Sequence, residues 1–357
     1  MAELLIIDGS HGEGGGQILR TALSLSAVTG RPFRIHNIRA GRREPGLRPQ
    51  HLTAVRALAA ICAARTEGDA LGSRELTFEP GDRPQAGEYT VDVEALSGTG
   101  SAGSATLIFQ ALLPPLAVAG SPSRLTLRGG THVRWSPPFQ YLSDVYLPTL
   151  ARAGFRAQLD LHRWGWYPAG GGEFVAHIAP STGTDGPGAL SPLELDERGR
   201  LLGVTGVSAA SNLPDHIIER QAERAVQRLR ARHIRAEVAL ERLQAQGAGT
   251  VLFQLARYEG AVAGFTGYGR VRYPAERVAD DAADALDRYV GRRAAVDPHL
   301  ADQLVVPLAL APGTSTYTTG EVTLHLLTVA WLAPQFLERD IIVEGDQGQP
   351  GRVTIGR

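Results

Sequence analysis

The chain contains no lysine, and all 36 of its basic residues are arginine. This absence excludes reactions that need a lysine amine, such as Schiff-base and pyridoxal chemistry. It also excludes the phosphate-loop NTPases, whose lysine contacts the β- and γ-phosphates, and the polynucleotide ligases that carry AMP on a lysine. If this chain activates phosphate covalently, another nitrogen must do it, and histidine is the remaining candidate.

Cysteine and long apolar runs are scarce as well. Cys62 is the single cysteine, which excludes an internal disulfide framework and a zinc site built on several cysteines. No apolar run approaches the roughly 20 residues of a membrane span. The first residues carry Glu3 and Asp8, where a signal peptide would carry positive charge. We therefore expect a cytoplasmic protein that has no membrane partner.

The residues that are present are typical of a folded α/β protein, with 43% hydrophobic and 20% charged residues and a net charge of −1. A 3.6-residue apolar period predicts helices at residues 17–29, 49–65, 102–118, 138–153, 215–230, 275–290, 300–310 and 323–337. Strand-like runs occur at 4–8, 33–39, 124–128, 156–164, 173–178, 251–258, 341–343 and 353–355. Pairs of helices followed by strands recur, which indicates repeated α/β units rather than one doubly wound sheet.

A domain boundary is visible in the composition. Residues 180–192, PSTGTDGPGALSP, are typical of a linker. A strand–helix–strand–strand pattern follows it. We predict a large domain made of residues 1–184 and 275–357, interrupted by a small α/β domain at 185–274.

A glycine-rich turn, DGSHGEGGGQILR at residues 8–20, connects a predicted strand to a predicted helix. Closely spaced backbone N–H groups and the helix N-terminus favour a phosphate there. The turn is not the dinucleotide fingerprint, because Gln17 stands at the third glycine. Glu13 would repel phosphate unless a divalent cation lies between them, so we interpret Glu13 as a Mg²⁺ ligand and Arg20 as a phosphate contact. A purely structural turn is the alternative.

An arginine cluster follows in IRAGRREPGLRPQH, residues 38–51. Residues 31–51 contain six arginines and one carboxylate, Glu44. Arginine binds phosphate oxygens in a bidentate manner, so the cluster indicates a phosphorylated polymer end, with a solvated basic face as the alternative.

The C-terminal region holds His299, Asp302 and Gln303 before an apolar helix, and His325 among leucines near a later helix start. A lone histidine in such surroundings is typical of a hydrogen-bonded core residue. From the residues alone, catalysis is not assigned to His325.

Taken together, these motifs resemble the RNA 3′-terminal phosphate cyclase family nearly end to end. They are GEGGGQ (12–17) with Arg20, RAGR (39–42), PGL (45–47), QHL (50–52), GGT (129–131), YP (167–168), GGG (170–172), LADQ (300–303) and HLLT (325–328). The resemblance implies an α/β (α+β) fold: three repeated units of two helices and a four-stranded sheet form a large domain, with a smaller inserted α/β domain.

The resemblance also implies an enzyme, a ligase-type nucleotidyltransferase. It implies ATP-dependent conversion of an RNA 3′-phosphate to a 2′,3′-cyclic phosphate through AMP carried on a histidine, which matches His325. ATP as co-substrate, Mg²⁺ or Mn²⁺ as metal and RNA 3′-phosphate ends as partner follow from it, and a homodimer is left open.

Site roles carry over from the family position by position. Glu13 matches the metal ligand. The positions that match nucleotide contacts are Gln110, Arg134, His299, Leu300, Ala301, Asp302 and Gln303. The positions that match the RNA 3′-phosphate pocket are Arg20, Arg39, Arg42 and Gln50. Three positions depart from the family: His299 replaces a common tyrosine, Arg134 a common proline and Ala169 a frequent arginine.

Three other functions are less consistent with the sequence. Non-catalytic relatives of the family that act in RNA processing or ribosome assembly lack the catalytic histidine, whereas His325 is present. Enolpyruvyl transferases also repeat small α/β units but rely on lysine as well as arginine. A plain RNA-binding module is disfavoured by the near-zero net charge.

Overall fold

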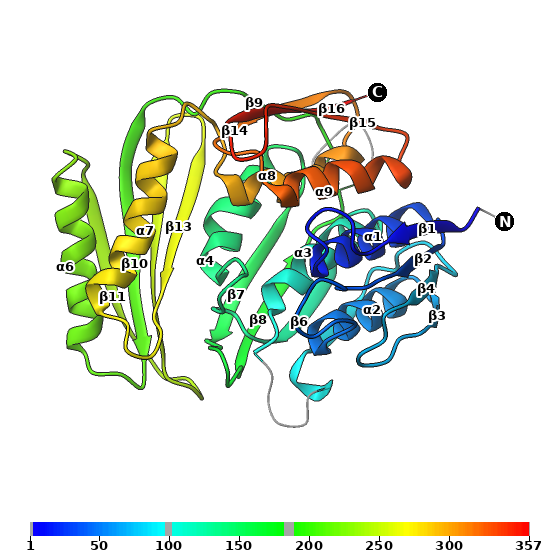
Figure 1. The fold of residues 1–357 in the computed structure, drawn as a ribbon, viewed down its shortest axis with the longest axis horizontal. Coiled ribbons are helices and arrows are strands. Elements are labelled where there is room, and N and C mark those ends of the chain that lie inside the picture. Colours follow the sequence, from blue (N-terminus) through cyan, green and yellow to red (C-terminus); the bar gives the residue numbers. More distant parts are fainter. Residues whose placement is uncertain (1–2, 97–101, 182–188, 357) are drawn as a thin grey trace.

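The computed structural model describes residues 3–96, 102–181 and 189–356. These residues form four sheets of four strands each, with helices packed between and against them (Figure 1). The α/β class predicted from the sequence is confirmed. Part of the predicted linker, residues 182–188, lies outside the described residues.

The first unit has the order strand, helix, strand, helix, strand, strand. Its elements are β1 (Leu5–Asp8), α1 (Gly16–Thr29), β2 (Phe33–His36), α2 (Pro49–Ile61), β3 (Arg65–Glu67) and β4 (Leu76–Glu79). The sheet order is β1-β2-β4-β3, with β1 and β2 parallel and the other pairs antiparallel. Phe33 and Ile35 are buried while Arg34 between them is exposed, so alternation along β2 places one face on the core.

The second unit repeats this order. Its elements are β5 (Glu88–Asp92), the short η1 (Glu94–Leu96), α3 (Ala105–Ala117), β6 (Ser123–Gly129), the consecutive helical turns α4 (Phe139–Tyr141), η2 (Leu142–Tyr146) and α5 (Leu147–Ala151), then β7 (Ala157–Arg163) and β8 (Gly172–Ile178). The sheet order is β5-β6-β8-β7, again with the first pair parallel.

The third unit has the same topology, although a long insertion follows its first strand. Its elements are β9 (Glu194–Leu195), α8 (Pro298–Leu310), β14 (Ser315–Thr319), α9 (Leu324–Leu332), η3 (Ala333–Gln335), β15 (Asp340–Glu344) and β16 (Gly351–Gly356). The sheet order is β9-β14-β16-β15, with β9 parallel to β14.

The inserted unit has a different strand order, β11-β10-β12-β13. Its elements are β10 (Leu201–Ser211), α6 (His216–Arg230), β11 (Ala236–Leu243), β12 (Gly249–Tyr258), β13 (Val262–Tyr268) and α7 (Ala275–Val290). It occupies one end of the molecule, and the two chain termini lie toward the other end (Figure 1).

Two elements lie on the other side of the predicted domain boundaries. We assigned residues 275–290 to the large domain, but α7 packs on the inserted sheet, where Val278 and Ala279 share an apolar cluster with Ala225 and Leu252. Conversely, β9 falls within the predicted inserted domain but pairs with β14 of the third unit. An amphipathic pattern predicts a helix with an apolar face and does not specify which sheet covers that face.

The helices of the three units meet in the middle of the molecule. Helix α1 contacts α2, α3 and α9, and α8 contacts α9. One hydrophobic core includes Phe33, Phe109, Phe174 and Tyr317, which come from all three units. Within the described part of the chain, no helix combines the length and the apolar character that crossing a membrane needs.

Candidate active site

The glycine-rich turn before α1 is attached to α9. The backbone N–H of Glu13 donates to Thr328 Oγ1 at 3.0 Å, and the Thr328 hydroxyl donates to the Leu324 carbonyl at 2.7 Å. His11 stacks on Trp331 with ring centroids 3.7 Å apart. Gly12 has a φ of +59°, and a side-chain carbon there would overlap the Thr328 hydroxyl. Glycine at position 12 therefore permits both the turn and its contact with α9.

A chain of hydrogen bonds runs from His325 through Gln17 to Asp302. Gln17 Nε2 donates to Asp302 Oδ2 at 2.5 Å, and Gln17 Oε1 lies 2.8 Å from His325 Nδ1. Because the carboxylate accepts from the amide nitrogen, the amide oxygen faces the imidazole and Nδ1 carries the proton. The lone pair on His325 Nε2 is then available to a ligand.

The electrostatic environment keeps this imidazole neutral. The ring is exposed at the mouth of a cavity, yet partial removal from water lowers the pKa of His325 to about 4, and the positive charges of Arg20 and Arg42 act in the same direction. Burial raises the pKa of Asp302 to about 7 and lowers that of Arg20 to about 10. At neutral pH the imidazole is thus an uncharged nucleophile beside a cationic guanidinium.

A cavity of about 620 Å³ opens beside His325. Its walls come from α1, α3, α8 and α9, from the segment before α4, and from β13 and α7 of the inserted unit. The predicted site residues among its lining residues are Arg20, Gln110, Arg134, His299, Asp302, Gln303 and His325. Across it, Gln110 Nε2 donates to Gln303 Oε1 at 2.6 Å. The structure therefore brings together residues that are up to 305 positions apart in the sequence, Arg20 and His325.

Four of the predicted site residues do not line the cavity. They are buried in the core or form hydrogen bonds with the backbone of the protein. Leu300 and Ala301 are fully buried in the core, so their side chains are not accessible to a ligand there. Arg39 donates to the carbonyls of Glu44 and Gly46, at 2.7 and 3.0 Å, and so holds its own loop. Gln50 accepts from the Ser104 N–H at 3.0 Å.

Glu13 and Arg42 are also absent from the residues that line the cavity, and they form an ion pair with each other. Among the described residues, no group of three or more His, Cys, Asp or Glu side chains is placed to hold a metal. Mg²⁺ usually keeps several waters and takes one or two carboxylates plus substrate phosphates. The single carboxylate of Glu13 therefore fits a cation that binds together with nucleotide phosphates.

Several residues at or beside the cavity were not predicted from the sequence. Thr328 lies three residues after His325, one helical turn away, and this spacing could have pointed to a shared face. Trp135, Tyr268 and Arg270 also line the cavity. The last two come from the inserted unit, and no local pattern indicated that this unit would reach the site.

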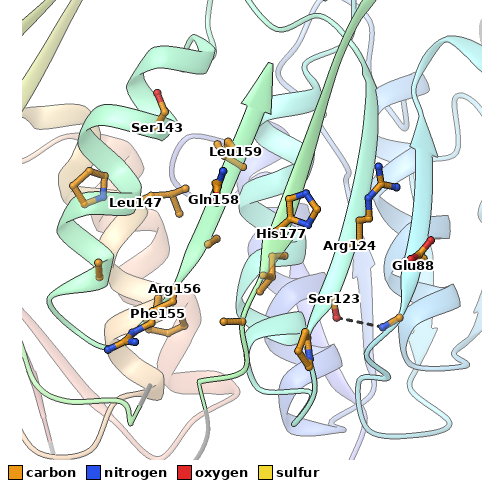
Figure 2. Close-up of a pocket in the computed structure, with 17 residues that line it drawn as sticks. Glu88, Ser123, Arg124, Ser143, Leu147, Phe155, Arg156, Gln158, Leu159 and His177 are labelled. Atoms are coloured by element: carbon orange, nitrogen blue, oxygen red, sulfur yellow. Dashed lines mark hydrogen bonds between the residues drawn. The ribbon is translucent and has the colours of Figure 1, made fainter. Parts of the chain in front are cut away.

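A larger pocket, of about 980 Å³, lies elsewhere, against the sheet β5-β6-β8-β7 (Figure 2). Glu88, Arg124, His177 and Gln158 form one row across its four strands. It contains none of the predicted site residues. Size alone therefore does not identify the candidate site, whereas the convergence of predicted residues does.

Comparisons with known proteins identify the family of the chain. The RNA 3′-terminal phosphate cyclase family model matches residues 11–343. Relatives with that name include one from Methylococcus capsulatus, 51% identical over 93% of this chain and 91% of its own length. Others are from Nostoc punctiforme, 48% identical over 93% and 94%, and Pyrococcus furiosus, 40% identical over 99% of both chains.

A solved structure, the enolpyruvyl transferase NikO from Streptomyces tendae, aligns with 100% of this chain and 49% of that chain at 13% identity. Its TM-score of 0.39 is too low to support an inference. The family match and the relatives over nearly the whole length are decisive: the chain belongs to the RNA 3′-terminal phosphate cyclase family.

Proposed function

We propose that this protein converts RNA 3′-terminal phosphate to a 2′,3′-cyclic phosphate with ATP, through a covalent His325–AMP intermediate. The observation that carries the proposal is the His325 imidazole, oriented by Gln17 at 2.8 Å, at the mouth of a cavity. That cavity is lined by Arg20 and by five of the predicted nucleotide contacts, Gln110, Arg134, His299, Asp302 and Gln303. Family membership and the names of the relatives support the overall activity.

In the first step the lone pair of His325 Nε2 attacks the α-phosphorus of ATP. The N–P bond forms as the bond between the α-phosphorus and the bridging oxygen breaks, and pyrophosphate leaves. The pKa of about 4 leaves the imidazole unprotonated at neutral pH, so no general base is needed to prepare the nucleophile. The proton on Nδ1 remains hydrogen-bonded to Gln17.

In the second step an oxygen of the RNA 3′-phosphate attacks the phosphorus of the His325-bound AMP. The N–P bond breaks, the imidazole is regenerated, and the RNA end becomes a phosphoanhydride. The adjacent 2′-hydroxyl then attacks the RNA phosphorus. The new O–P bond forms as the phosphoanhydride bond breaks, AMP leaves, and the hydroxyl proton passes to water. Both reacting groups belong to one nucleotide, so the last step benefits from high effective molarity.

Arginines would hold the phosphates during these steps. Arg20 lines the cavity, and Arg42 is close enough to influence the pKa of His325. Bidentate guanidinium contacts would orient the RNA 3′-phosphate. A Mg²⁺ ion held by Glu13 would neutralise phosphate charge when bound.

The proposal is tested by incubating the wild-type protein with α-³²P-ATP and Mg²⁺, first without RNA and then with an RNA that ends in a 3′-phosphate. We expect a protein-bound AMP that survives alkali and is released by acid, as a phosphoramidate should be. Adding the RNA should release AMP and yield a cyclic phosphate end, whereas the matched RNA with a 3′-hydroxyl should not react. A protein that forms neither the labelled adduct nor the cyclic end contradicts the proposal.

The protonation of His325 gives a second expected result. Because its pKa is lowered to about 4, the imidazole should remain neutral between pH 8 and about pH 5.5, where an ordinary histidine with a pKa near 6.5 becomes mostly charged. The measurement is an NMR titration of the histidine ring carbons, with the His325 signal assigned by its absence from His325→Asn. A midpoint between pH 6 and 7 for that signal would disprove the proposed environment.

A further inference from the structure

We propose that the body of the RNA, upstream of its reacting 3′ end, binds a rim formed jointly by the large body and the inserted unit. We call this surface the arginine–aromatic rim and define it as Arg134, Trp135, Arg270, Arg272 and Tyr273. The inference rests on the proposed function, because it assumes that an RNA 3′ end reaches His325. It assigns to the inserted unit a role in holding single-stranded RNA.

The body contributes an exposed aromatic side chain. Trp135 is 90% exposed, its φ is +67°, and the Arg134 guanidinium lies 5.1 Å from its ring centroid. Its segment is held in place, because Thr106 Oγ1 donates to the Pro137 carbonyl at 2.8 Å. A left-handed backbone at a non-glycine residue is unfavourable in isolation, and such strain concentrates at ligand-binding sites.

The inserted unit contributes a similar group across the cavity mouth. Arg270 stacks on Tyr273 with its guanidinium carbon 3.9 Å from the ring centroid, and Val271 beside it is 92% exposed. Arg272 is exposed and also has a positive φ, +60°. The Tyr273 hydroxyl donates to the Asp281 carboxylate at 2.9 Å, which holds the ring.

The two sides belong to one opening. Arg134, Trp135 and Arg270 all line the cavity that His325 borders. The Tyr268 hydroxyl lies 3.4 Å from the Ser136 carbonyl, so the strand before Arg270 touches the segment that carries Trp135. A ligand that emerges from the cavity at this point meets both sides at once.

The chemistry of the rim fits a single-stranded nucleic acid. Unstacked bases bind on aromatic rings and guanidinium planes, and arginines neutralise the phosphates between them. Asp281 is a carboxylate at this edge, and the Tyr273 hydroxyl donates to it. Since the nucleotide is accommodated within a cavity of about 620 Å³, a tryptophan that projects into solvent is suited to a ligand that extends beyond the cavity, as a polymer does.

The test compares Trp135→Ala, Trp135→Phe and Arg272→Ala with a control, Arg235→Ala. Arg235 belongs to the same inserted unit and its side chain is 86% exposed. It lies near the opposite end of the sheet. Ala236, the residue after Arg235, pairs with Val204 near the start of β10, whereas Tyr268 pairs with Val251, which in turn pairs with Ala209 near the end of β10. The substrates are 3′-phosphorylated RNAs of two nucleotides and of ten nucleotides, and ATP is assayed separately by adduct formation without RNA.

We expect Trp135→Ala to raise KM for the ten-nucleotide RNA about tenfold. This is the loss of affinity expected when one base–aromatic stacking contact is removed. The KM for the dinucleotide and the KM for ATP should each change less than about twofold, and Trp135→Phe should restore most of the loss. Arg272→Ala should weaken binding of the longer RNA and reduce its salt dependence, whereas Arg235→Ala should match the wild type.

Other outcomes overturn the inference. A rise in KM for ATP with Trp135→Ala would assign the tryptophan to the nucleotide, and equal losses for both RNA lengths would place it at the reacting end. If Trp135→Ala changed the KM for neither RNA, the rim would not be part of the RNA-binding site. Fluorescence anisotropy of labelled RNA measures its binding without catalysis, so the rim can be judged even if no adduct or cyclic product forms.

Discussion

Replacing His325 with asparagine should abolish the AMP adduct and lower RNA cyclisation by roughly a thousandfold or more, because the proposed nucleophile is gone. Asparagine is the sharpest substitution, since its side-chain amide can still donate to Gln17 Oε1, the atom that lies 2.8 Å from His325 Nδ1. The hydrogen bond to α1 is then retained while the attacking nitrogen is lost. The measurement is the RNA-free reaction with α-³²P-ATP, followed by gel separation of labelled protein.

The matched control is His299→Asn, at another histidine that lines the same cavity. This variant should still form the adduct, with a higher KM for ATP. Thermal unfolding of both variants near the wild-type temperature would show that the fold is retained. A folded His325→Asn protein that still becomes labelled would refute the histidine assignment.

Gly12→Ala should be the second severe substitution. A side-chain carbon at this position overlaps the Thr328 hydroxyl, which accepts the Glu13 N–H, and φ is +59°. The turn must therefore move away from α9, taking Glu13 and Gln17 with it. We expect adduct formation to fall about a hundredfold, in line with the sensitivity of catalysis to misplacements of about 1 Å.

Gly30→Ala is the control that distinguishes two effects of Gly12→Ala, the overlap with a neighbouring side chain and the strain of a left-handed backbone. Gly30 ends α1 with a φ of +71°, but a side-chain carbon there has no atom within 4 Å. It should cost roughly 1–2 kcal/mol of stability through its left-handed conformation and leave adduct formation intact. If overlap with Thr328 is the cause, Gly12→Ala/Thr328→Ala should be no worse than Gly12→Ala alone. Equal loss of adduct in Gly12→Ala and Gly30→Ala would show instead that strain alone is responsible.

The helices could be predicted from sequence patterns more completely than the strands. Helix α7 was predicted with its observed bounds, Ala275–Val290, because an apolar stripe recurs over 16 residues. Strands β3 and β9 contain 3 and 2 residues, too few for an alternation to be recognised. These strands exist because a neighbouring strand offers hydrogen-bonding partners, which is a tertiary property.

Part of the candidate site was also predictable. Glycines in the turn indicated a close backbone approach, and arginines near it indicated phosphate. The role of His325 came from the family resemblance, since its leucine neighbours alone are typical of a core position. The structural use of Arg39 and Gln50 could not be predicted, because their partners are backbone groups of a loop and of Ser104, the residue before α3.

The sequence by itself determined which chemical groups are available: histidine, arginine and carboxylate but no lysine amine, with no more than one thiol. Tertiary structure alone decided that His325 would meet Gln17, 308 residues away, and that β13 of the inserted unit would form a wall of the same cavity. It also decided that the imidazole would be neutral, because a pKa of about 4 depends on lost solvent and on charges brought in by other helices. Residue type sets what a side chain can do, and contacts between distant segments set its neighbours and its charge.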